Sequence, residues 1–146
     1  MSEPAAIAMQ TSIGIQAIRC HTDGGIENLG RTLLSHYKTE NKVRTLIARG
    51  NVYWVGKYVF PDPRKPHSFD LPQEEVTIAD SRDRGEQLIR AKRYKTEEKY
   101  FADDKSFASE VMYLFKDGRW FYIGYEQIYE GLPRIPHDLE QAAWGW

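Results

Sequence analysis

The spacing of hydrophobic residues changes once between residues 13 and 37. Up to Cys20 or His21, apolar residues alternate with polar or small ones, which predicts a strand. The next four residues form a predicted turn in which glycines allow positive φ: Thr22, Asp23, Gly24 and Gly25. Beyond the turn, apolar side chains recur at helical spacing, which predicts a helix capped by Thr22 or Asp23: Ile26, Leu29, Leu33, Leu34 and Tyr37.

A second helix is predicted directly after the first. Its apolar face consists of Val43, Leu46 and Ile47. Thr39 is placed to cap its start, and Gly50 is placed to end it. The short connection between the two helices predicts a helical hairpin that lies on a sheet.

The middle of the chain is less regular. Residues 51–60 are aromatic and β-branched, which fits either a strand or a loop wall, and the proline-rich residues 61–72 predict an extended connection. The remaining predicted elements are a short strand over 76–80, a charged turn over 81–86, a strand over 87–94 and a weak helix over 95–104.

The strongest pattern comes late in the chain. Two apolar runs flank Asp117-Gly118, a dipeptide typical of two-residue β-hairpin turns. A short helix is predicted over about 138–143, followed by Trp144 and Trp146. Residues 1–11 read as a flexible leader and residues 12–146 as a single globular domain. The predicted fold is α+β: an antiparallel sheet of about four to six strands with a helical hairpin packed on one face.

Composition narrows the functional classes. The formal net charge is −1, whereas a dedicated binder of duplex DNA usually has a basic excess. The single cysteine, Cys20, forms no internal disulfide, and no apolar run approaches the length of a membrane span, so we expect a cytoplasmic protein that does not enter membranes. The nine tyrosines and four tryptophans are many for so small a domain, which suggests a homo-oligomer.

The turn after the first predicted strand is one candidate site. A Gly-Gly turn that leads into a helix presents free backbone N–H groups to an anion, although Asp23 would repel a phosphate and no P-loop motif is present. The alternative is a capped helix start without a ligand. His21, Asp23 and His36 were also considered as metal ligands, but His36 lies about 15 Å along the helix, so we expect no metal. Cys20 and His21 should point to opposite faces of their strand.

A second candidate is the basic segment that begins at Arg82. It carries six Lys or Arg residues within residues 82–95, with acidic residues between them. Arg82 and Arg84 suit phosphate recognition, and Tyr53 and Trp54 offer stacking surfaces for a base. The alternative is a solvated, salt-bridged turn.

Four motifs carry a resemblance to known proteins. They are His-x-Asp-Gly at residues 21–24, Leu-Leu-x-His-Tyr at 33–37, Arg-Asp-Arg-Gly-Glu at 82–86, and an Asp-Gly hairpin that ends in Trp120. Over most of residues 18–122 the chain resembles a group of small, uncharacterised bacteriophage and mobile-element proteins. It departs from them in "NVYWVGKY" (51–58), where a Ser-Leu-Gly segment is common. The resemblance implies an accessory protein that counters host defence in the host cell cytoplasm.

Taken together, these features predict a non-catalytic protein that sequesters a phosphorylated, nucleotide-like ligand and needs no cofactor. The ligand would lie between the helix start and the arginine turn, against aromatic walls: His21, Thr22, Asp23, Gly24, Gly25, Arg82, Arg84, Tyr53 and Trp54. One alternative is an inhibitor that binds a host defence or regulatory protein through exposed aromatic and terminal tryptophan side chains. The other alternative is a small hydrolase that uses His21 and Asp23.

Overall fold

The computed structural model describes residues 3–144 and shows an α+β fold built on a mixed sheet of eight strands in this range. The strands are β1 (Ala5–Thr11), β2 (Gly14–Cys20), β3 (Val52–Trp54), β4 (Ile78–Ala79), β5 (Lys92–Tyr94), β6 (Val111–Lys116), β7 (Arg119–Ile123) and β8 (His137–Asp138). The helices are the π-helical turn η1 (Ile26–Gly30), α1 (Arg31–His36), α2 (Glu40–Ile47), α3 (Asp80–Arg84), α4 (Glu97–Phe101), α5 (Asp104–Phe107), α6 (Tyr125–Tyr129) and α7 (Leu139–Trp144).

Strand β1 corrects two of the sequence-based expectations. Residues 5–11 are not a flexible leader, because they form a strand between β2 and β6 at the centre of the sheet. The sheet is also not purely antiparallel, since β1 pairs with β2 antiparallel but with β6 parallel. The strand order is β4-β3-β2-β1-β6-β7-β8, and β5 also pairs with β2. β1 lacks polar alternation because both of its faces are covered, a pattern typical of central strands.

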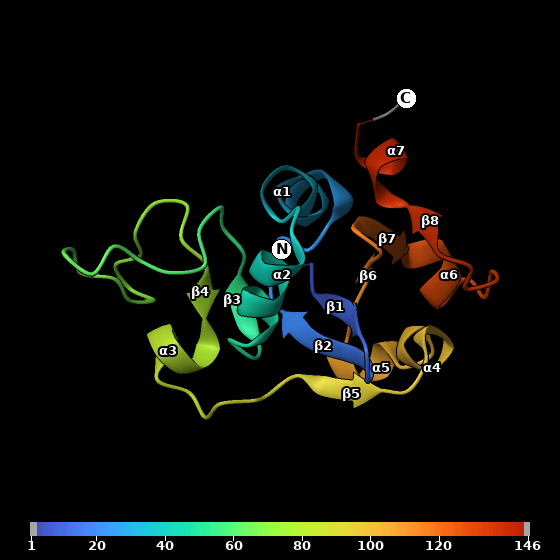
Figure 1. Cartoon of the computed structure of the whole chain (residues 1–146), viewed down its shortest axis with the longest axis horizontal. Coiled ribbons are helices and arrows are strands. Elements are labelled where there is room, and N and C mark those ends of the chain that lie inside the picture. The colour runs from blue at the N-terminus through green and yellow to red at the C-terminus, as the bar shows by residue number, and fades with distance from the viewer. Residues whose placement is uncertain (1–2, 145–146) are drawn as a thin grey trace.

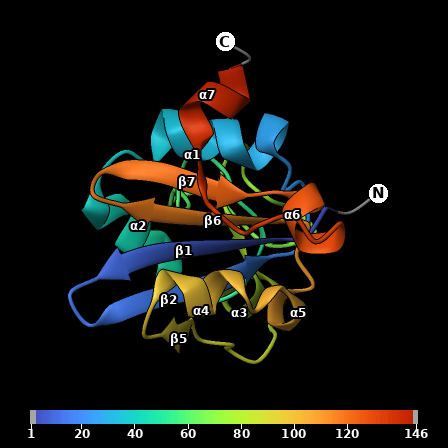
Figure 2. The same cartoon turned by 90° about the vertical axis from the view of Figure 1, so that its right-hand side faces the viewer.

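Helices cover the sheet on both faces (Figures 1 and 2). On one face, η1, α1, α2 and α7 contribute Leu29, Leu33, Leu46 and Leu139 to a core with Ile7 and Ile18. On the other face, α4, α5 and α6 contribute Tyr100, Phe107 and Ile128 to a core with Ala6 and Leu114. The alternating residues of β1 therefore serve two separate cores. The structure does not show the predicted helical hairpin.

Two predicted end signals are confirmed in α2 and the β6–β7 hairpin. The Thr39 side chain accepts a hydrogen bond from the Lys42 N–H at 3.3 Å and caps α2. Asp117 and Gly118 have φ values of 53° and 75°, as a hairpin turn with two left-handed residues requires. The predicted tail helix is also present as α7. Trp146 lies outside the described residues.

The irregular middle of the chain is ordered by short elements. Only residues 52–54 of the 51–60 segment form a strand, and residues 61–72 have no regular structure, as their prolines predict. The charged turn predicted over 81–86 is instead the short helix α3, which ends at Gly85 with φ 69°. No helix among residues 3–144 is long and apolar enough to cross a membrane.

Seven aromatic side chains of residues 3–144 are buried within one chain, and four of them carry a polar atom: Tyr37, Tyr100, Tyr113 and Trp120. Their polar atoms donate hydrogen bonds to buried carbonyl groups, so their burial leaves no unpaired donor. These bonds are Tyr37 Oη to Gly56 O at 2.7 Å, Tyr100 Oη to Tyr113 O at 2.8 Å, Tyr113 Oη to Gly24 O at 2.7 Å, and Trp120 Nε1 to Tyr37 O at 2.9 Å. The buried part of the aromatic content thus packs within one chain, while Tyr58, Phe60, Tyr125 and Tyr129 are each about half exposed.

Candidate functional site

The predicted turn at residues 22–25 is present, but its backbone geometry differs from expectation. The residue with positive φ is Asp23, at 55°, whereas Gly25 is extended and precedes η1. No side chain caps η1, so the predicted cap by Thr22 or Asp23 is wrong. Gly24 is required for a different reason: its N–H donates to Glu3 O at 2.7 Å, and a Cβ at this position would lie 2.5 Å from the Cβ of Ala5.

Three of the predicted ligand residues meet in an aromatic stack beside this turn. The His21 ring lies parallel to the Tyr53 ring, with 5.1 Å between centroids. The Arg84 guanidinium lies 4.8 Å from the Tyr53 centroid and 4.6 Å from that of Phe69. The chain thus brings His21, Tyr53 and Arg84 together, as predicted. Phe69 was missed because it comes from the irregular proline-rich segment, where no periodic pattern assigns an inward direction.

The charge of Arg84 is already balanced within this stack. Its Nη1 lies 3.6 Å from a carboxylate oxygen of Asp80 and 3.6 Å from one of Glu86. Burial, followed by the charge of Glu86, raises the pKa of Asp80 above its ordinary value. Two carboxylates around one guanidinium make this location less suitable for a phosphate than its sequence suggests.

Arg82 has a structural role in the fold. It donates to Val59 O at 2.8 Å, to Thr77 O at 2.7 Å, and through Nε and Nη2 to the Asp83 carboxylate at 2.8 Å each. His67 Nε2 lies 3.2 Å from the same carboxylate, and both of these side chains are only 3% exposed. These contacts join the proline-rich segment to α3. They occupy the guanidinium donors of Arg82 that a phosphate ligand would need.

Asp83 is held in its charged form by these neighbours. Burial alone would raise the pKa of Asp83, but hydrogen bonds from Arg82 and the Ala79 N–H, with His67 close by, hold it below the ordinary value. The Nδ1 of His67 accepts a hydrogen bond from the Gln73 N–H at 2.9 Å. The backbone thus holds Nδ1 of His67, while Nε2 is buried 3.2 Å from the Asp83 carboxylate without a hydrogen bond of good geometry.

Trp54 and Asp23 lie in a different place from the stack. Both line a cavity of about 340 Å³ at the start of η1, together with Glu27 and Arg31. Tyr53 and Trp54 are neighbours on β3, so their side chains point to opposite sides of the strand. The residues predicted to form one site are thus divided between two locations.

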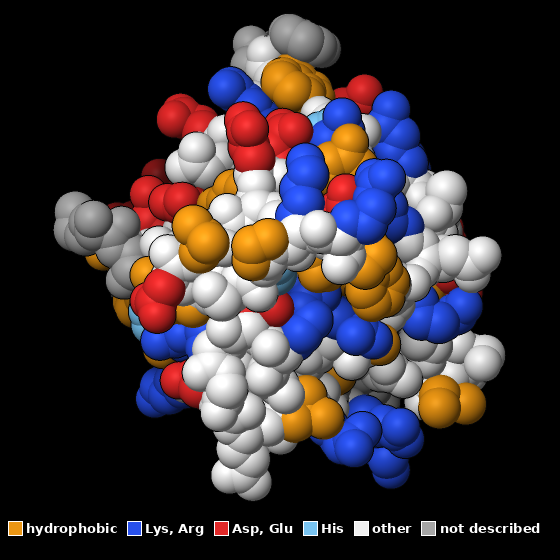
Figure 3. All heavy atoms as spheres, turned by 90° about the vertical axis from the view of Figure 1, so that its left-hand side faces the viewer, with side chains coloured by type: hydrophobic (Ala, Val, Ile, Leu, Met, Phe, Trp, Pro, Cys, Tyr) orange, Lys and Arg blue, Asp and Glu red, His pale blue; other side chains and the backbone are white. Residues whose placement is uncertain are grey.

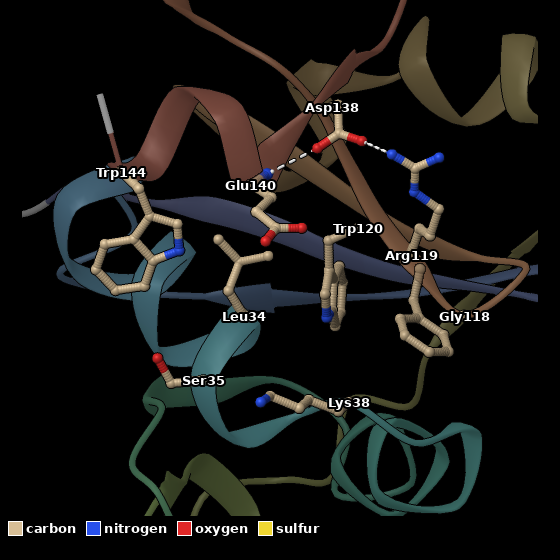
Figure 4. A pocket seen from close by; sticks show the side chains of 10 residues that line it. Leu34, Ser35, Lys38, Gly118, Arg119, Trp120, Asp138, Glu140 and Trp144 are labelled. Atoms are coloured by element: carbon tan, nitrogen blue, oxygen red, sulfur yellow. Dashed lines mark hydrogen bonds and ion pairs between the residues drawn. The ribbon is translucent and has the colours of Figure 1, made fainter. Parts of the chain in front are cut away.

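A second cavity lies between α1, the β6–β7 hairpin and α7 (Figure 4). Its volume is about 410 Å³, and we call it the two-tryptophan cavity. Its lining residues are Leu34, Ser35, Lys38, Phe115, Gly118, Arg119, Trp120, Asp138, Glu140 and Trp144. Figure 4 shows the indoles of Trp120 and Trp144 on either side of Leu34, with the Glu140 carboxylate between them.

The charged groups of this cavity fall into two kinds. Arg119 is ion-paired with Asp138, whose other oxygen accepts the Glu140 N–H at 2.9 Å. Within residues 3–144, the side chains of Lys38 and Glu140 form no ion pair. The cavity therefore offers aromatic surface, one carboxylate and one ammonium group. The sequence pointed to Trp144 only as an exposed aromatic residue, and nothing in the sequence linked it to Lys38.

Cys20 and His21, the neighbouring pair that could suggest nucleophilic catalysis, lie on opposite sides of their strand. Cys20 is buried in the core, and burial raises the pKa of its thiol to about 12. His21 lies on Tyr53 and within 3.1 Å of Arg19 Nη1, so Cys20 and His21 face apart, as predicted. The described residues contain no group of three or more His, Cys, Asp or Glu side chains suited to a metal ion.

Comparison with known proteins adds no assignment to either cavity. The sequence matches no protein-family model, and it matches neither a curated protein nor a solved structure. The chemistry of the described residues is therefore what supports a functional conclusion.

Proposed function

We propose that this protein binds a nucleotide-like small molecule without transforming it, and that the two-tryptophan cavity holds the ligand. The observation that carries the proposal is the convergence of the Trp144 indole with Glu140 and Lys38 in one cavity, whose floor includes the largely buried ring of Trp120. An indole is a stacking surface for a nucleobase, a carboxylate accepts hydrogen bonds from base N–H groups, and an ammonium group binds phosphate.

The size and composition of the cavity fit this class of ligand. Small-molecule sites commonly enclose about 300–1,000 Å³ and combine apolar walls with a few polar groups. The walls here are Leu34, Trp120 and Trp144, and the polar groups are Glu140 on α7 and Lys38 in the connection after α1.

The proposal places the ligand away from the arginine turn. Arg82 is engaged by the fold, and Arg84 already has two carboxylate partners. The ligand class expected from the sequence is retained, while the site moves to residues on α1, β7 and α7. The stack of His21, Tyr53 and Arg84 is the alternative position for the ligand.

Calorimetric titration with linear and cyclic nucleotides tests both locations. We expect binding that Trp144→Ala and Glu140→Gln each weaken at least about tenfold, the loss of one aromatic contact or one charge-assisted hydrogen bond. Trp54→Ala and Arg84→Ala are the matched controls and should leave affinity unchanged. Binding that depends on Arg84 and not on Trp144 would contradict the cavity assignment, and no binding by any nucleotide at millimolar concentration would refute the proposal.

The second candidate function is binding to a protein partner, and a specific surface favours it. Four large apolar side chains on α6 and the segment after it are each about half exposed or more: Tyr125, Tyr129, Leu132 and Ile135. Exposed apolar residues grouped in this way often mark an interface. A stoichiometric partner recovered from host lysate by the wild type but not by Leu132→Asp would favour this function. Light scattering on both proteins shows whether the partner is a second copy of the chain.

A further inference from the structure

A group of basic side chains lies next to the two-tryptophan cavity. It consists of His36 at the end of α1, Lys38 in the following connection, Lys42 on α2 and Lys57 in the loop after β3. Lys42 Nζ donates to Lys57 O at 2.8 Å and lies 4.5 Å from the Tyr37 ring centroid. Lys57 Nζ lies 5.4 Å from the Tyr58 ring centroid. The Lys42 side chain thereby joins α2 to the loop after β3.

Within the described part of the chain, the lysines of this group are not held in ion pairs, and Glu75 is the one acidic residue whose charge acts on His36. Among residues 3–144, none of the three lysines forms an ion pair with a carboxylate. Burial and then the charge of Lys57 lower the pKa of Lys42. Burial, followed by Lys57 and Lys42, also lowers the pKa of His36, with Lys38 acting in the same direction and Glu75 opposing. The basic groups therefore repel one another in the free protein.

The segment that carries Lys42 and Lys57 is mostly basic, with Glu40 before it and Glu75 beside the loop after β3. Residues 41–65 contain six Lys or Arg residues and a single acidic residue, Asp62. Asp62 is itself paired with Arg64 at 3.1 Å. On the face shown in Figure 3, Lys and Arg side chains lie among exposed hydrophobic and acidic ones. Cations without ion pairs beside a cavity attract an anionic ligand and are stabilised by it.

We infer that His36, Lys38, Lys42 and Lys57 form an anion subsite that receives the phosphoryl group of the ligand. Lys38 connects the two parts, because it directly follows Tyr37, on whose ring Lys42 lies, and also lines the two-tryptophan cavity. The inference deepens the proposed function and rests on it for the identity of the whole ligand. Its chemistry is narrower: a phosphate-bearing small anion, either free or as part of a nucleotide.

The subsite is tested with inorganic pyrophosphate and the titration of His36 followed by NMR. Pyrophosphate should raise the pKa of His36 relative to sodium chloride at equal ionic strength, because a bound anion stabilises the imidazolium. The increase should fall sharply in Lys42→Gln and Lys57→Gln, whose side chains keep most of the apolar stem. Lys105→Gln, an exposed lysine on α5, is the control and should leave the increase unchanged. An unchanged pKa in pyrophosphate, or an increase that ignores both substitutions, would overturn the inference.

Calorimetry with adenosine, AMP and pyrophosphate separates this subsite from the cavity. If both exist, AMP binds at least about tenfold more tightly than adenosine, and Lys57→Gln removes that difference. Pyrophosphate binding without any nucleoside or nucleotide preference supports the subsite and counts against the cavity proposal. Adenosine and AMP binding with equal affinity, with no response to pyrophosphate, supports the cavity and refutes the subsite.

Discussion

Gly24→Ala should destabilise the fold because strand β1 approaches this residue too closely for a side chain. A Cβ at Gly24 would lie 2.5 Å from both the Ala5 Cβ and the Glu3 backbone oxygen. Overpacking of this kind costs about 1–3 kcal/mol, and weakening the Gly24 N–H bond to Glu3 O adds about 1 kcal/mol. We therefore expect a loss of about 2–4 kcal/mol in the free energy of unfolding, measured by urea denaturation.

Gly25→Ala is the matched control for this prediction. Its Cβ would meet mainly the carboxylate end of Glu3, a flexible side chain that can move away. Gly25 also has a φ of −66°, which alanine adopts without strain. The control should change the free energy of unfolding by less than about 1 kcal/mol. Equal losses for the two variants would refute the reasoning, because they would show that the turn itself needs glycine rather than room for β1.

Three further predictions concern stability. Arg82→Ala should lower the free energy of unfolding by about 2–4 kcal/mol in urea denaturation, because the Val59 and Thr77 carbonyls and the Asp83 carboxylate lose their donor. Arg84→Ala should lower it by only about 1 kcal/mol. Equal losses for the two variants would contradict the roles assigned to these arginines. Asp83→Asn should lower the free energy of unfolding at pH 7, and the difference from the wild type should shrink below about pH 4. The reason is that the folded-state pKa of Asp83 lies below the ordinary value of about 3.9. The stabilisation by the carboxylate is therefore present above that value and is lost as the pH falls through the folded-state pKa. A loss of stability in Asp83→Asn that does not change with pH would contradict the role of the Asp83 charge. Tyr113→Phe should cost about 1–2 kcal/mol in thermal unfolding, because the Gly24 carbonyl loses a buried donor at 2.7 Å, and an unchanged melting temperature would show that this bond contributes nothing.

Periodic patterns in the sequence predicted the elements that are amphipathic or have strong end signals. The β6–β7 hairpin is an example, because Asp117-Gly118 favours left-handed backbone geometry and apolar runs flank it. Strand β1 was missed for the opposite reason: its residues are buried on both faces, so no alternation marks them. The parallel pairing of β1 with β6 joins residues about a hundred positions apart, which local periodicity cannot reveal.

The candidate site was only partly accessible from the sequence. His21, Tyr53 and Arg84 were expected together and do meet, because a strand end, a neighbouring strand and α3 converge there. The grouping of Lys38 with Trp144 depends on how α7 docks against α1, a long-range contact with no local signature. The charge balance around Arg84 also required structure, since Asp80 and Glu86 are common neighbours in any charged segment.

The most direct test of the proposed ligand site is an NMR titration of the tryptophan indole N–H signals with AMP. Trp144 lines the two-tryptophan cavity, whereas Trp54 lines the cavity beside the opening turn, so the two rings report on different locations. Single Trp→Phe variants assign the signals. We predict that AMP shifts the Trp144 signal saturably and leaves that of Trp54 in place. A saturable shift of Trp54 with no change at Trp144 would contradict the account.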